Sequence, residues 1–234
     1  MRGLQRAIGV GFVAFLFAGW VLGPALIQPG TIMIGDWVHP DNLSNHWLLV
    51  WVAEQLSQGL GILHNDQYYW PIGDAPVLAG NGNEGFLYLP FHLIFGWPDA
   101  VVPYLFVVFC INGIGGWVLA RACGASFPSS FLVLASTTVA PFTLQECSSG
   151  RFSQVSIGWL LLFLGAWFSL LRVSGSDNEA CHATIKRHAM LAGILLAITA
   201  FFYWYYGFFG VMAAAISLLV HGKSRPAWRT LMTF

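Results

Sequence analysis

The sequence contains few charged residues. Only 9% of its 234 residues are Asp, Glu, Lys or Arg, whereas soluble domains carry about a quarter. This deficit excludes an ordinary soluble domain, because most of the chain cannot then face water. The formal net charge is zero and no basic run occurs, so the composition gives no indication of nucleic-acid binding.

Cysteine motifs are also absent. The four cysteines include no Cys-x-x-Cys pair, which excludes a zinc knuckle or a redox motif, and they show no disulfide framework. The chain is rich in apolar residues: 57% of it is hydrophobic, with 11 tryptophans and 19 phenylalanines. Aromatic residues gather at membrane interfaces, so this composition indicates an integral membrane protein.

The hydrophobic runs predict an all-α, polytopic membrane helix bundle with about six transmembrane helices, forming a single membrane domain over residues 1–234. The first span is expected at residues 8–27, which is too long for the apolar core of a secretory signal. Five further spans are expected within residues 101–222. They are drawn from the runs Val101–Ala120, Phe131–Leu144, Ile157–Leu171 and Met190–Val220, the last divided at Tyr203–Gly207.

Residues 28–100 form a large loop between the first two spans. Within it, Asp41 or Asn42 is expected to cap a helix that Gly59 ends. The run Phe86–Trp97 is short and contains Pro90, which favours an interfacial or re-entrant segment over a span. Every Lys and Arg except Arg151 then falls on the side of the N-terminus. The positive-inside rule therefore predicts that both termini are cytoplasmic and that the large loop is exterior.

Three charged residues on the exterior side are candidates for chemistry. Asp36, just past the first span, could act as a general base or hold a divalent cation, although an exposed loop acid or a turn cap is the simpler interpretation. Glu146 and Arg151 bracket a short polar stretch. The fork of Arg151, the one exterior cation, suits phosphate oxygens. A local ion pair between Glu146 and Arg151 is an equal alternative, and the two are compatible if a substrate displaces the pair.

Two further polar residues are taken as candidates for substrate binding. His39 lies in the large loop, seven residues before His46, and Gln154 begins the fourth span. The histidines lack a third ligand for a metal site, so ordinary interfacial histidines are the better interpretation. Ser153 and Gln154 have a simpler role as helix caps.

The order of these parts resembles the GT-C superfamily of membrane glycosyltransferases. Similarity to bacterial members lies in Asp36, Asn45-His46-Trp47, Tyr69-Trp70-Pro71-Ile72-Gly73, Leu89-Pro90-Phe91, Ala140-Pro141-Phe142, Ser149-Gly150-Arg151-Phe152-Ser153-Gln154 and Tyr205-Tyr206-Gly207. The resemblance spans nearly the whole chain. It implies transfer of a sugar from a polyprenyl-phosphate carrier to an acceptor on the non-cytoplasmic side. The sequence shows no organelle signal, which, together with this resemblance, implies the inner or plasma membrane.

The resemblance also implies roles for individual residues. Asp36 becomes a catalytic base or metal ligand, Glu146 a second acid and metal ligand, and Arg151 a donor-phosphate ligand, with Mg or Mn as the candidate metal. The expected partners are a lipid-linked sugar donor and membrane lipid. Family members usually have more spans, so we expect this chain to be an N-terminal fragment or an incomplete gene product.

Two other functions compete with glycosyl transfer. A non-catalytic or truncated membrane scaffold would have the same spans but a poorly formed exterior cavity. A transporter would carry ionisable residues or broken helices inside its spans. The predicted spans contain almost no ionisable residues, and the polar groups collect in the exterior loops, which disfavours transport.

Overall fold

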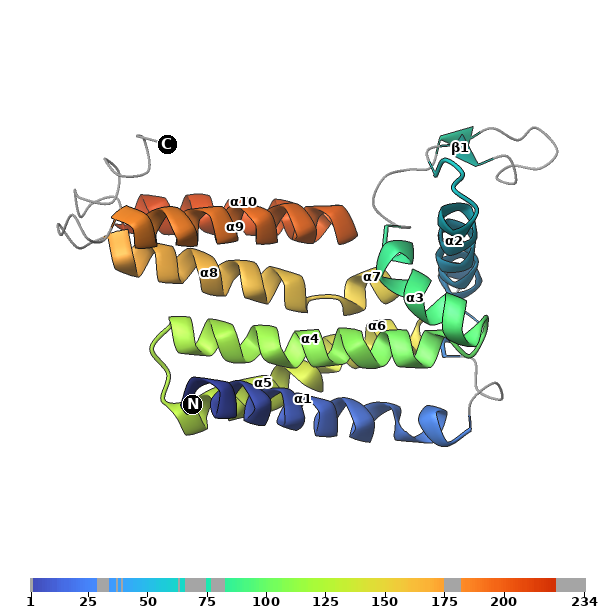
Figure 1. Cartoon of the computed structure of the whole chain (residues 1–234), viewed down its shortest axis with the longest axis horizontal. Helices are drawn as coiled ribbons and strands as arrows, with labels where there is room; N and C mark the ends of the chain where they lie inside the picture. Colours follow the sequence, from blue (N-terminus) through green and yellow to red (C-terminus); the bar gives the residue numbers. More distant parts are fainter. Residues whose placement is uncertain are drawn as a thin grey trace.

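The computed structural model describes residues 2–28, 34–36, 38, 40–62, 64–65, 75–76, 83–174 and 182–221. The described helices are α1 (Arg2–Ile27), α2 (Pro40–Ser57), α3 (Gly85–Phe95), α4 (Val101–Ala122), α5 (Phe127–Thr138), α6 (Pro141–Ser148), α7 (Phe152–Val155), α8 (Gly158–Ser174), α9 (His182–Phe202) and α10 (Trp204–His221). One antiparallel pair of two-residue strands, β1 (His64–Asn65) and β2 (Ala75–Pro76), accompanies them in this part of the chain. The prediction of an all-α membrane helix bundle is confirmed (Figure 1).

The helices have the length and composition of membrane spans. Among the described residues, five segments are long and apolar enough to cross a membrane: Gln5–Ile27, Val101–Ala122, Phe127–Ser148, Phe152–Ser174 and His182–Phe202. The helix α10 is apolar but shorter. The long run Met190–Val220 divides as predicted, because α9 ends at Phe202 and α10 begins at Trp204.

The bundle has two chemically different ends. Figure 1 shows that α1 begins and α10 ends at one end, whereas α2, α3 and β1 lie at the other. Because α1 ends and α4 begins at that second end, α3 does not cross the bundle, as its length predicts. We call the second end the acidic end, after Asp36, Asp41, Glu54, Glu84, Asp99 and Glu146; the first is the basic end, after Arg6, Arg121, Arg172, Lys186 and Arg187.

The helix α4 lies in the middle of the bundle and approaches α8 closely through glycine. A Cβ added to Gly158 would lie 2.6 Å from the backbone of Ile111, so only glycine permits this approach. The break between α7 and α8 faces Asn112, whose amide donates to the Val155 carbonyl at 2.8 Å and accepts from the Gly158 N–H at 2.7 Å. Asn112 therefore satisfies the backbone groups that the break leaves free inside the bundle.

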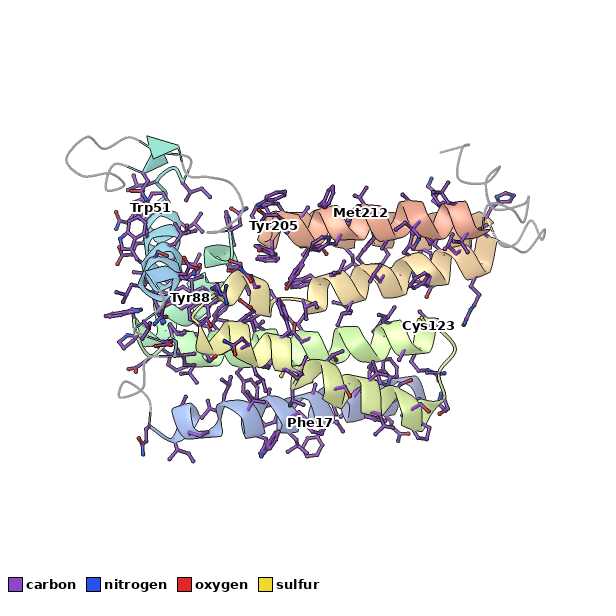
Figure 2. The ribbon with its side chains drawn as sticks, turned by 180° about the vertical axis from the view of Figure 1, so that it is seen from behind. Phe17, Trp51, Tyr88, Cys123, Tyr205 and Met212 are labelled. Atoms are coloured by element: carbon purple, nitrogen blue, oxygen red, sulfur yellow. The ribbon has the colours of Figure 1, made fainter. Side chains whose placement is uncertain are left out.

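The surface helix α2 lies across the acidic end, at a steep angle to the bundle helices (Figure 1). It begins at Pro40, a position that suits proline because the N–H groups of the first turn have no acceptor within the helix, so the missing N–H of proline costs no helical hydrogen bond. Asp41 therefore lies in the first turn and does not cap the helix from outside, which corrects the expected start. Leu49 and Ala53 of α2 pack in one apolar cluster with Tyr88 of α3, which Figure 2 labels. The packing holds α2 over the ends of α4, α6 and α7.

Candidate functional site

Glu146 and Arg151 form an ion pair at the turn between α6 and α7. Arg151 Nε lies 2.8 Å from Glu146 Oε2, and the backbone N–H of Arg151 also donates to the carbonyl of Glu146 at 2.9 Å. Gly150 makes this turn possible with a φ of +71°, a region that favours glycine. The Glu146 side chain is 8% exposed and that of Arg151 is 31% exposed. The arginine is thus anchored on one side and still open to a further acceptor.

A second carboxyl lies near this pair and is almost completely buried. Glu84, which directly precedes α3, is 2% exposed. Its Oε2 accepts a hydrogen bond from Ser153 Oγ at 2.9 Å and its Oε1 one from Ser156 Oγ at 3.3 Å. Burial raises the pKa of Glu84 to about 8, against the opposing effect of the two serine hydrogen bonds. Glu84 is therefore largely protonated at neutral pH.

The corner between α9 and α10 borders the same group of residues. Burial, and then the charges of Tyr205, Glu146 and Glu84, raise the pKa of Tyr203, while Arg151 opposes them. The hydroxyl of Tyr206 donates to the backbone carbonyl of Gln154 at 2.6 Å. Figure 2 labels Tyr205 at this corner. We call Glu84, Glu146, Arg151 and Tyr203 the Glu84–Arg151 cluster.

The loop that carries Asp36 meets the loop that carries Arg151 over one buried amide. Asn42 of α2 is completely buried, and its side-chain amide has no hydrogen-bond partner among the described residues. A Cβ added to Gly35 would lie 2.0 Å from Asn42 Oδ1, and one added to Gly150 would lie 2.1 Å from the same atom. Both glycines therefore press against Asn42, and Asp36 and Arg151 follow them directly in sequence.

The Asp36 carboxylate itself faces outward. It is exposed, and its Oδ1 accepts a hydrogen bond from the Val38 N–H at 2.9 Å. Within the described part of the chain it forms no ion pair with Arg151. The fold thus brings Asp36 to the rim of the site and Glu146 and Arg151 into contact, and Gln154 lies half-buried one helical turn from Arg151. His39 lies outside the described residues.

His46 connects α2 to the loop before Asp36 and to α7. Its Nε2 lies 2.8 Å from the carbonyl oxygen of Ile34, and its ring meets the ring of Phe152 edge-on at 4.9 Å. Because a carbonyl only accepts, Nε2 carries the proton in this contact. Burial lowers the pKa of His46, against the opposing effect of the Ile34 carbonyl. His46 is therefore a neutral structural group that joins α2 to the loop before Asp36 and to α7.

Metal ligands are sparse in this region. No group of three or more His, Cys, Asp or Glu side chains that could hold a metal occurs among the residues that the structure describes. Of the two candidate ligands, Glu146 is already paired with Arg151 and Asp36 is exposed. A cation at Glu146 would have to displace the guanidinium or share its carboxylate.

Glu84 is a candidate site residue that the sequence analysis does not identify. No motif in the sequence singles it out, because its burial depends on serines 69 and 72 residues away. The available signal was its position: a lone carboxyl directly before the apolar segment Gly85–Phe95. A carboxyl at the start of an apolar segment lies close to groups that are packed away from water, so it is more often buried than an acid in an open loop.

Comparison with known proteins adds no assignment. No protein-family model, curated protein or solved structure that was compared with this chain matches it.

Proposed function

We propose that this chain is a membrane glycosyltransferase that moves a sugar from a polyprenyl-phosphate carrier to an acceptor on the non-cytoplasmic side. The observation that supports this most directly is the partly open Arg151, held by a buried carboxylate beside a second carboxyl that is largely neutral. This arrangement suits a phosphate ester, because the bidentate fork of arginine matches phosphate oxygens. The chain's apolar spans would bring it into contact with the lipid part of such a donor.

The proposed orientation follows from the charges at the two ends of the bundle. Arg6, Arg121, Arg172, Lys186 and Arg187 lie at the basic end, and the acids that the structure describes lie at the acidic end with Arg151. Basic residues are retained on the cytoplasmic side of membranes. The basic end, where α1 begins and α10 ends, is therefore cytoplasmic, and the site is exterior.

The proposed reaction is a displacement at the anomeric carbon of the donor sugar. The acceptor hydroxyl oxygen forms a bond to this carbon as the bond to the phosphate oxygen breaks, and the hydroxyl proton passes to Asp36. Polyprenyl phosphate leaves with the electron pair, and Arg151 stabilises its developing charge. Protonated Glu84 adds no negative charge against the phosphate, which leaves the site able to bind an anion.

The role of a divalent metal stays secondary in this proposal. Mg or Mn would use Asp36 and Glu146, but the described residues add no third ligand, and Arg151 already neutralises Glu146. Arg151 therefore supplies the positive charge in the proposed step. A bound metal would supply further neutralisation of the leaving phosphate.

The first part of the test concerns binding of the polyprenyl-phosphate group, which all such donors share whatever sugar they carry. Binding of polyprenyl monophosphate to the full chain in lipid nanodiscs is measured for the wild type and for Arg151→Gln. Losing a hydrogen bond to a charged group costs about 1.5–3 kcal/mol, so we expect affinity to fall at least about tenfold. Arg172→Gln, in the last turn of α8 at the basic end, is the matched control and should bind like the wild type.

The second part of the test concerns turnover. Release of polyprenyl phosphate is followed from a panel of polyprenyl-phosphate hexoses and pentoses, with and without Asp36→Asn. We expect one donor to be consumed by the wild type and not by the variant. Equal phosphate binding by Arg151→Gln and Arg172→Gln refutes the site. Selective binding without consumption of any donor refutes catalysis and favours a non-catalytic scaffold.

A further inference from the structure

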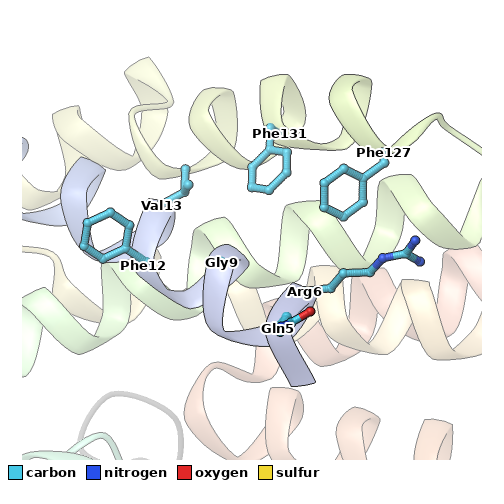
Figure 3. A pocket seen from close by; sticks show the side chains of 7 residues that line it. All are labelled: Gln5, Arg6, Gly9, Phe12, Val13, Phe127 and Phe131. Carbon is cyan, nitrogen blue, oxygen red and sulfur yellow. The ribbon is translucent and has the colours of Figure 1, made fainter. Parts of the chain in front are cut away.

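An open groove lies between α1 and α5 near the basic end of the bundle, far from the Glu84–Arg151 cluster along the helices. Its volume is about 420 Å³, within the range of small-molecule pockets. Figure 3 shows the rings of Phe127 and Phe131 along one side and α1 along the other. The residues that line it include Arg6, Gly9, Phe12, Val13, Phe127 and Phe131. The proposed function makes no use of this groove.

The groove exists because a glycine and two aromatic rings face each other. A Cβ added to Gly9 would have nothing within 4 Å, so the surface of α1 is open at this turn. On α5, Phe127 and Phe131 pack edge to face with ring centroids 5.0 Å apart and form a rigid apolar wall. Val13 and Phe131, which line the groove, also pack against the buried residues Val10 and Leu134. The result is an apolar channel on the lateral surface of a membrane protein.

A single cation lies at one side of the groove. The guanidinium carbon of Arg6 is 5.6 Å from the centroid of the Phe127 ring, a cation–π distance that holds the side chain over the groove. Arg6 is exposed and has no carboxylate partner within the described part of the chain. Arg6 is the second residue of the span Gln5–Ile27, and an arginine at the end of a span places its charge at the level of the lipid headgroups.

We propose that this groove binds one anionic phospholipid from the leaflet at the basic end. An acyl chain lies over Gly9 and against Phe131, and the headgroup phosphate pairs with Arg6. Charge complementarity selects this occupant, because an apolar helix of a second copy would leave Arg6 without a counter-charge. Basic pockets between spans at the cytoplasmic face bind anionic lipid headgroups in the same way.

The charge is tested by native mass spectrometry of the full chain, released from nanodiscs of phosphatidylglycerol or of phosphatidylcholine with identical acyl chains. The wild type should retain one phosphatidylglycerol in preference to phosphatidylcholine. Arg6→Gln should weaken phosphatidylglycerol retention about fivefold, since one basic side chain contributes about that factor. Lys186→Gln, an exposed cation at the same end on α9, is the matched control and should retain the lipid.

The shape of the groove is tested separately. Gly9→Leu fills the groove and should abolish retention of both lipids, whereas Gly11→Leu, at another open glycine of α1 that does not line it, should not. Equal losses for Arg6→Gln and Lys186→Gln overturn the proposal, because they indicate general electrostatic attraction. Unchanged retention in Gly9→Leu also overturns it. A dimer without bound lipid, lost in Gly9→Leu, would instead assign the groove to a second copy.

Discussion

Replacing Glu84 with Gln should stabilise the folded chain at alkaline pH and leave its stability at acidic pH unchanged. The reason is that burial raises the pKa of this carboxyl from 4.5 to about 8. Between these values the folded chain holds a proton that the unfolded chain has released, so stability falls as pH rises through this range. Below pH 4.5 both states are protonated, and above pH 8 both are ionised.

The size of the effect follows from the same two values. The interval from 4.5 to about 8 corresponds to ~5 kcal/mol, which is the stability that ionisation of Glu84 removes by alkaline pH. Glutamine has the shape of the protonated acid. Its amide oxygen can accept from one of Ser153 and Ser156, and its NH₂ can donate to the other, so the variant keeps the hydrogen bonds without the charge.

The assay is thermal unfolding of the purified chain in detergent at pH 5 and pH 9. We expect Glu84→Gln and the wild type to have similar melting temperatures at pH 5, and the variant to melt higher at pH 9. The matched control is Glu54→Gln on α2, an exposed glutamate whose replacement should give the same small difference at both pH values. A Glu84→Gln variant that is destabilised equally at both pH values would refute the reasoning, because Glu84 would then be a well-compensated carboxylate.

Two further predictions concern the framework of the site. Gly158→Ala should lower the melting temperature by an amount equivalent to about 1–3 kcal/mol, because the new Cβ would lie 2.6 Å from the Ile111 backbone; Gly193→Ala, where a Cβ meets nothing within 4 Å, is the control and should not. His46→Gln should become more stable relative to the wild type as pH falls below 6.5, because the unfolded chain then gains a proton that the buried His46 resists. Melting curves at pH 7.5 and 5.5 measure this, and a difference that does not change with pH contradicts it.

The arrangement of the spans could be predicted from the sequence because the membrane imposes a simple rule. Every backbone group in the lipid must bond within its own helix, so a span appears as an uninterrupted apolar run. The run Met190–Val220 is too long for one helix, and its aromatic centre at Tyr203 marks the corner that the structure shows. Phe86–Trp97 is too short and stays at one end of the bundle. Length and polarity were sufficient in both cases.

The contacts of the site could not be predicted in this way. The ion pair between Glu146 and Arg151 is local, and it could be proposed because only one turn separates its members. The burial of Glu84 needs the α7–α8 break, whose serines contact a residue about seventy positions away, and hydropathy along the chain does not reveal that contact. The meeting of Gly35 and Gly150 over Asn42 joins three segments with no shared pattern in the sequence. Such contacts come from tertiary packing and have no periodicity.

The burial and protonation of the three carboxyls also indicate which of them could act as the base in the proposed reaction. A general base must be reachable by the acceptor and must be able to take a proton, and a buried carboxyl that already holds one satisfies neither condition. Glu84, which accepts two serine hydrogen bonds and is largely protonated, is therefore not the base, and Glu146 is committed to Arg151. Asp36 is exposed, and its loop meets the turn before Arg151 over Asn42, so it is the carboxylate that an acceptor from solvent can reach first. Carboxyls whose surroundings separate their protonation states divide acid and base roles in this manner.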